Sequence, residues 1–261
     1  MKKINFKKIQ LAVAIAFFAS LAGISQGAEI LHWTGEMTAG VFDDASGNGN
    51  TGDSYDNATN APGLIGNAIY LNGSGALVQN WACSGLPTLA TDTWSMNAYI
   101  RLDVICPNWG QVYNFGSDSY NTANRGLIGY NVTGGQDVRF VTSNAGANQL
   151  WTGVMWTNNV WHMYTVVCDG TNVQFYYDGT QTGVTKTRGV DGFTMADGSQ
   201  YAMVGRSPWG QKIEGLVDEF TIWDHRLSQS EIDGLAYKLI PEPTTMLIMT
   251  SFIFAFFLKR K

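Results

Sequence analysis

Residues 160–180, VWHMYTVVCDGTNVQFYYDGT, decide the fold class of this 261-residue chain. They contain two runs rich in aromatic and β-branched residues, separated by Asp-Gly-Thr-Asn at positions 169–172. A second Asp-Gly-Thr follows at positions 178–180. Runs of this composition joined by a tight Asp-Gly turn predict the two antiparallel strands of a β-hairpin.

The upstream stretch TWSMNAYIRLD, residues 93–103, shows the period of two that is typical of a strand. One face would carry Trp94, Met96, Ala98, Ile100 and Leu102, and the other Ser95, Asn97, Tyr99 and Arg101. Further strands are expected in AIYLNG, QVYNFG, RGLIGYNV, DVRFVTS, LWTGVMW, YAMVGR and GLVDEFTIWD.

Only LSQSEIDGLAYKL has helical spacing, with Ser228 or Ser230 as the N-cap and Glu231 in the first turn. Its apolar face would carry Ile232, Leu235 and Ala236. Short strands without long helices, and without an internal repeat, predict an all-β antiparallel sandwich or jelly roll with one short C-terminal helix.

Residues 1–28 are typical of a secretory signal peptide. Four lysines precede an uncharged apolar run, and the small residues Ser25 and Gly27 precede Ala28. The alternative, a transmembrane helix, needs about 20 apolar residues, and this run is shorter. We therefore expect cleavage near Gly27 or Ala28, with a single domain at 29–240.

The charge of the body argues against a nucleic-acid partner. Nine of the 16 Lys and Arg residues but 20 of the 21 Asp and Glu residues lie in 28–240, which gives a net charge near −11. Binding to nucleic acid requires basic patches.

The three cysteines leave two outcomes open. Cys83 and Cys106 lie in loop-like sequence and would form the disulfide if an exported protein oxidises a pair, but both could equally stay unpaired. Cys168 ends an apolar strand and is expected to be a small buried hydrophobe.

Several stretches in order resemble the laminin-G-like domains of the concanavalin A-like lectin/glucanase superfamily. They are FDDASGNGNTG, GLIGNAIYLNGSGALV, TDTWSMNAYIRL, NVWHMYTVVCDGTNVQFYYDGT and AMVGRSPWGQKIEGLVDEFTIWDHRLSQSEI. The resemblance covers about residues 30–238. It implies a jelly roll of two curved antiparallel sheets, with a concave face often used for sugars.

The loop DDASGNGN could hold Ca²⁺, which takes about six to eight oxygen ligands from carboxylates and carbonyls. Asp44 would supply a charge, and Gly47 and Asn50 would supply carbonyls. The family often holds calcium between such a loop and the strand carrying Asp-Glu, so the resemblance makes Asp218 the second charge. The alternative is a tight turn stabilised by Asn and Asp.

Exposed indole rings stack on sugars, and five tryptophans are expected in loops: Trp81, Trp109, Trp151, Trp156 and Trp209. Trp109 and Trp209 share a Trp-Gly-Gln setting. These two residues and Tyr113 are the predicted sugar contacts. The alternative for each is burial in the core, because aromatic residues dominate the cores of such folds.

No catalytic residues are predicted. The resemblance would place glucanase carboxylates in a Glu-x-Asp-x-Glu strand, and that motif is missing. In EGLVDEF, strand alternation would turn Asp218 and Glu219 to opposite faces.

The last 21 residues, 241–261, contain Pro-Glu-Pro, an apolar stretch at 246–258 and a basic end. The stretch would span about 20 Å as a helix, too short for a ~30 Å bilayer core. The tail resembles the bacterial PEP-CTERM sorting signal, which an exosortase-type membrane protease removes. We thus expect an exported, non-enzymatic carbohydrate-binding or adhesion module of the cell surface or extracellular polysaccharide matrix. The alternatives are a structural matrix protein and a glycan-active hydrolase.

Overall fold

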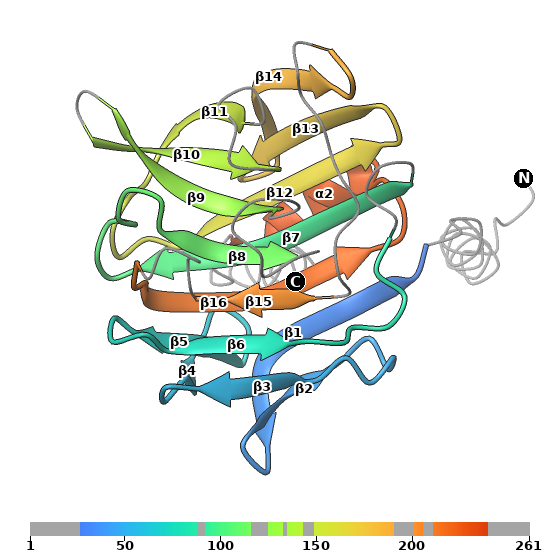
Figure 1. Cartoon of the computed structure of the whole chain (residues 1–261). Coiled ribbons are helices and arrows are strands. Elements are labelled where there is room, and N and C mark those ends of the chain that lie inside the picture. The colour runs from blue at the N-terminus through green and yellow to red at the C-terminus, as the bar shows by residue number, and fades with distance from the viewer. Residues whose placement is uncertain are drawn as a thin grey trace, which may run out of the picture.

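The computed structural model describes residues 27–87, 92–115, 125–132, 135–142, 149–190, 201–205 and 211–239. Its strands lie in two layers, one in front of the other in Figure 1. Across the front sheet the order is β11 (Gln149–Met155), β10 (Gly135–Val141), β9 (Arg125–Val132), β8 (Gln111–Phe115), β15 (Ala202–Val204), β6 (Leu77–Asn80) and β3 (Gly52–Tyr55).

Across the back sheet the order is β1 (Glu29–Thr38), β16 (Glu214–Trp223), β7 (Thr93–Leu102), β12 (His162–Asp169), β13 (Asn172–Tyr177) and β14 (Thr180–Thr187). β2 (Val41–Asp44) links β3 to β1, and β4 (Thr59–Pro62) pairs with β5 (Asn67–Asn72), which pairs with β16. The named strands pair antiparallel throughout, so the predicted sandwich is confirmed.

The hairpin over 160–180 forms as its turn chemistry predicts. Cys168 pairs with Val173 across the first turn. In the second turn Asp178 and Gly179 have φ values of +48° and +83°. Two successive residues with positive φ suit a two-residue turn whose twist matches that of the strands.

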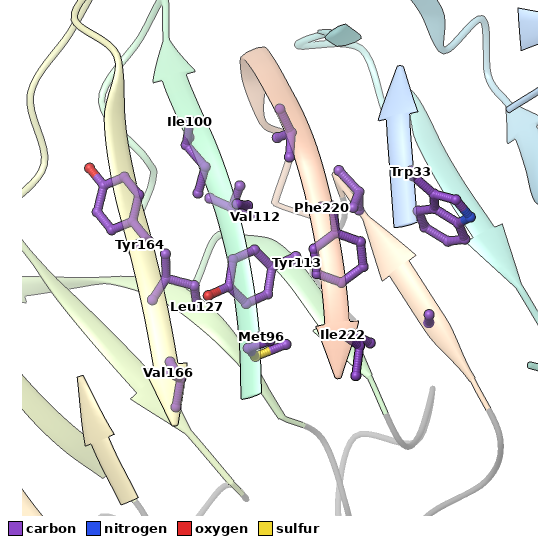
Figure 2. Close-up of a cluster of buried hydrophobic side chains, with 14 of the residues drawn as sticks. Trp33, Met96, Ile100, Val112, Tyr113, Leu127, Tyr164, Val166, Phe220 and Ile222 are labelled. Carbon is purple, nitrogen blue, oxygen red and sulfur yellow. The ribbon is translucent and has the colours of Figure 1, made fainter. Parts of the chain in front are cut away.

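The main core lies between the two sheets (Figure 2). The even-numbered face of β7 enters it as alternation predicts, because Trp94, Met96, Ala98, Ile100 and Leu102 are all buried there. Figure 2 shows Met96 near Tyr113 and Ile100 near Val112, both of which belong to β8 of the front sheet.

A second apolar layer covers the outer face of the back sheet. α2 (Gln229–Ala236) begins at the N-cap Ser228, which forms a capping box with Glu231 as predicted. The helix buries Ile232 against Tyr99 and Trp223, and in Figure 1 it lies behind the sheet. The 3₁₀ helix η2 (Tyr237–Leu239) follows.

The free edges of the two sheets approach each other closely. Gly183 of β14 has φ +69°, and a Cβ there would lie 2.2 Å from the carbonyl oxygen of Trp151 in β11. This position therefore requires glycine, and the close approach nearly closes the sandwich.

None of the described residues forms a helix that is long and apolar enough to cross a membrane. The predicted signal peptide up to residue 26 and the predicted sorting tail lie outside the described residues.

Candidate functional site

The outer face of the front sheet carries buried polar side chains on β10. Val138 and Phe140 point into the core, so Asp137 and Arg139 point outward. The register places Arg139 opposite Trp151 of β11, and Asp137 opposite Tyr130 of β9. Side chains from three neighbouring strands therefore meet on this face.

The guanidinium group of Arg139 is fixed by hydrogen bonds and by contacts with aromatic rings. Its Nε donates to Oδ2 of Asp137 at 2.9 Å, and its Nη1 donates to Oε1 of Gln149 at 2.7 Å. Its guanidinium carbon lies 3.6 Å from the ring centroid of Tyr130 and 4.5 Å from that of Trp151. Only 4 % of Arg139 is exposed. A planar cation between two rings is a strong cation–π arrangement, which fixes the orientation of both rings.

Trp109 joins this arrangement from the loop before β8. Its main-chain N–H donates to the carbonyl oxygen of Gly129 at 2.7 Å, which attaches the loop to β9. Its ring lies 5.0 Å from that of Tyr130, nearly perpendicular to it. The structure thus places this predicted sugar contact beside the polar residues of β10.

We call these residues together the Arg139 cluster: Trp109, Tyr130, Asp137, Arg139, Gln149 and Trp151. Trp151 is 57 % exposed. Oδ1 of Asp137 is buried and has no hydrogen-bond partner. An exposed indole beside a carboxylate oxygen that lacks a donor can stack on a sugar ring and accept a hydrogen bond from a hydroxyl group.

Most residues of this cluster are not predicted from the sequence. Trp151 was expected in a loop but lies in β11. The alternation in GQDVRFV was the available signal, because it separates Asp137 and Arg139 from the core residues. The register with β9 and β11, which brings in Tyr130 and Trp151, is not visible in any single stretch.

The prediction that Tyr113 contacts sugar is wrong. Its ring lies in the core beside that of Phe220 (Figure 2), and the two ring centroids are 5.2 Å apart. The register of β8 against β9 shifts between Gln111 and Tyr113, so both Val112 and Tyr113 point inward. Burial raises the pKa of Tyr113. Trp209, the third predicted contact, lies outside the described residues.

The disulfide considered between Cys83 and Cys106 does not form, since both thiols are free and buried. Cys83 follows β6, whereas Cys106 packs against Gly129 of β9. β15 and β8 lie between those strands, at a spacing of about 4.8 Å each. A disulfide needs Cα atoms within about 7 Å.

The loop with Asp44 is a closed turn. Oδ1 of Asp44 accepts from the N–H groups of His32 at 2.9 Å and Ser46 at 3.1 Å. Oδ2 accepts from the hydroxyl group of Ser46 and the N–H of Asn50, both at 2.8 Å. The four donors come from the turn itself and from His32 of the neighbouring strand β1, and they use every lone pair of this carboxylate.

The other predicted calcium ligands are also engaged or distant. The main-chain oxygen of Asn50 accepts from the indole N–H of Trp33 at 2.7 Å. Asp44 pairs with Trp33 on the core side of the back sheet, whereas Asp218 pairs with Tyr99 on the outer side. The structure therefore does not bring Asp44 and Asp218 together as the two charges of one calcium site. Within the described ranges, no three His, Cys, Asp or Glu side chains are grouped to hold a metal ion.

Asp218 and Glu219 lie on the same face, not on opposite faces as alternation predicts. Glu219 has φ +51°, and the register against β7 shifts there, so the strand bulges. Oδ2 of Asp218 accepts from the N–H groups of Leu64 and Ile65 at 2.8 and 2.9 Å. Glu219 contacts His32 and Lys238, both at 3.2 Å. Both carboxylates are buried and connect elements of the fold.

Comparison with known proteins places the fold in context. A family model described as the concanavalin A-like lectin/glucanases superfamily matches residues 72–233. None of the curated proteins matches the sequence.

Among solved structures, domain 4 of a GH43 extracellular arabinanase from Geobacillus stearothermophilus, in complex with arabinotriose, has a TM-score of 0.64 at 18% identity. The match covers 80% of this chain and 98% of that one.

The binding domain of botulinum neurotoxin DC in complex with SialylT has a TM-score of 0.62 at 17% identity, covering 82% of this chain and 52% of that one. The binding domain of Paraclostridial Mosquitocidal Protein 1 has a TM-score of 0.56 at 14% identity, covering 80% and 52%. The chain thus spans about half the length of these two toxin chains, and the likeness shows a shared fold.

Proposed function

Because this chain belongs to the concanavalin A-like lectin/glucanases superfamily, we propose that it is a non-catalytic carbohydrate-binding module. Its binding surface is the Arg139 cluster. The observation that carries this proposal is the exposed ring of Trp151, fixed by Arg139 beside the buried Oδ1 of Asp137, which lacks a donor. Fixed aromatic rings with a few oriented polar atoms are what a sugar site requires.

The solved structures support a carbohydrate ligand in general. The arabinanase domain was solved with arabinotriose and the neurotoxin domain with SialylT. Both have the same fold at low identity, so they support the class of ligand and not a particular sugar.

The carboxylates of the back sheet support a non-catalytic role. A glycosidase needs two carboxyl groups about 5–9 Å apart that flank a sugar. Asp218 is fully buried and Glu219 is 7 % exposed, and both are bonded to neighbouring elements of the fold. We therefore expect no release of reducing sugar from any polysaccharide that the protein binds.

A glycan array probed with the purified full-length protein tests the proposal. We expect binding to a limited set of oligosaccharides, and weaker binding of the same set in Trp151→Ala. An array on which the wild-type protein binds no glycan would refute the proposed function.

From the sequence we also propose that the protein is exported and that an exosortase-type protease removes residues 241–261. Mass spectrometry of the protein recovered from the cell surface or medium tests this proposal. A full-length cytosolic product would contradict it.

A further inference from the structure

The hydrogen bonding of the Arg139 cluster indicates which class of glycan it takes. We propose that the cluster binds a neutral, hydroxyl-rich glycan and discriminates against glycans bearing carboxylate or sulfate groups. This inference rests on the proposed function and concerns the ligand of the same site.

The positive charge of the cluster is not free to bind an anion. The guanidinium group of Arg139 is paired with Asp137 and bonded to Gln149, and its two faces are covered by Tyr130 and Trp151. An acidic sugar would have to replace Asp137 as the partner of Arg139. It would then leave the carboxylate of Asp137 buried and unpaired, which is strongly unfavourable.

The polar atom of the cluster that lacks a partner is an acceptor. Oδ1 of Asp137 is buried without a hydrogen-bond partner, on a residue that still reaches the surface, since 8 % of Asp137 is exposed. A buried acceptor without a partner is costly, and a hydroxyl group is the sugar donor that satisfies it. A carboxylate or sulfate group offers only further acceptors.

The charge of the rest of the protein acts in the same direction. The acidic body, with a net charge near −11 over residues 28–240, would repel polyanions at long range.

Paired probes test the inference. The full-length protein is applied to an array carrying arabinotriose and galactotriose beside trigalacturonate and sialyllactose, together with neutral and acidic plant and bacterial oligosaccharides. We expect every bound glycan to be neutral. Equal or tighter binding of acidic glycans would overturn the inference and leave the proposed function standing, whereas an array without any binding would remove the proposed function itself.

Variants of Asp137 test the acceptor with the best neutral trisaccharide found. Asp137→Asn exchanges a charge-assisted hydrogen bond for a neutral one, and we expect about tenfold weaker binding. The matched control is Asp53→Asn, which makes the same change on the same sheet five strands from β10 and should leave the affinity unchanged. If Asp137→Asn lowers the melting temperature, Asp137→Glu serves instead, because it keeps a carboxylate for Arg139 but moves the acceptor by one methylene group. It should weaken binding of the trisaccharide severalfold, and unchanged affinity in a folded variant would refute the assignment.

Discussion

Nε2 of His32 lies 3.2 Å from Oε2 of Glu219, although 187 residues separate them in sequence. His32 is in β1, and Glu219 is at the bulge of the adjacent strand β16. Glu29 approaches Nδ1 of His32 at 3.2 Å, and Lys238 approaches the same Glu219 oxygen at 3.2 Å. These charged side chains connect β1 and β16, the first and last strands in the sequence, to the C-terminal helical segment.

The stability of the protein should fall as the pH rises from about 6.5 to 9. Burial by itself lowers the pKa of His32, but hydrogen bonds with Glu219 and Glu29 outweigh it and raise the pKa to about 9. A raised pKa stabilises the fold below the unfolded value of 6.5, and this stability is lost as the pH passes through 9. The shift corresponds to at most about 3 kcal/mol.

Thermal melts across this pH range check the expectation. His32→Gln should flatten the dependence of the melting temperature on pH between 6.5 and 9. Asp218 acts in the same direction at lower pH, because burial raises its pKa to about 7. The fold favours its protonated form, so stability falls as the pH rises from about 4 to 7. If the dependence of the melting temperature on pH were unchanged in His32→Gln, the imidazole of His32 would not be the group that releases a proton in this range.

EDTA should leave the melting temperature unchanged, and so should millimolar CaCl₂. Both oxygens of Asp44 already accept hydrogen bonds from the turn, and Asp218 faces the other side of the sheet. Differential scanning fluorimetry measures this directly. A rise of several degrees on addition of calcium would restore the calcium site that the loop sequence predicts.

Trp151→Ala should weaken binding to the best array glycan by about tenfold, because stacking on an indole contributes about 0.5–1.5 kcal/mol beyond the buried area. The side chain is 57 % exposed, so the melting temperature should change little. Tyr237→Ala, which removes an aromatic ring of similar exposure from η2 behind the back sheet, is the control. Equal losses in both variants would contradict the assignment of the site to the front sheet.

Tyr113→Phe should leave glycan binding intact and stabilise the fold by up to about 1 kcal/mol. The hydroxyl group of Tyr113 is buried without a hydrogen-bond partner, and removing such a group relieves part of its desolvation penalty of about 1–3 kcal/mol. Calorimetry and the glycan titration together check this prediction. Weaker glycan binding by a stably folded Tyr113→Phe variant would show that Tyr113 does contribute to the sugar site.

The three thiols should react with a thiol reagent only after unfolding. Cys83, Cys106 and Cys168 are buried and free, and burial raises the pKa of Cys83 to about 12. The thiolate is the reactive form, so native protein should react slowly. Titration of the oxidised, unfolded protein should find three thiols, and finding a single thiol would indicate the disulfide that the structure lacks.

Local patterns in the sequence were sufficient for the architecture. The alternation in β7, the Asp-Gly turns and the Ser228–Glu231 capping box each predict an element that the structure contains. These features depend on residues a few positions apart, because side-chain periodicity, turn dihedral angles and caps are properties of the local chain.

Tertiary structure decided which aromatic and acidic residues face outward. The shift in β8 sends Tyr113 into the core, and the bulge at Glu219 places two successive carboxylates on one face. The strand register brings Tyr130, Arg139 and Trp151 together. Bulges and registers are set by pairing between strands, so a period of two read along one strand cannot locate them.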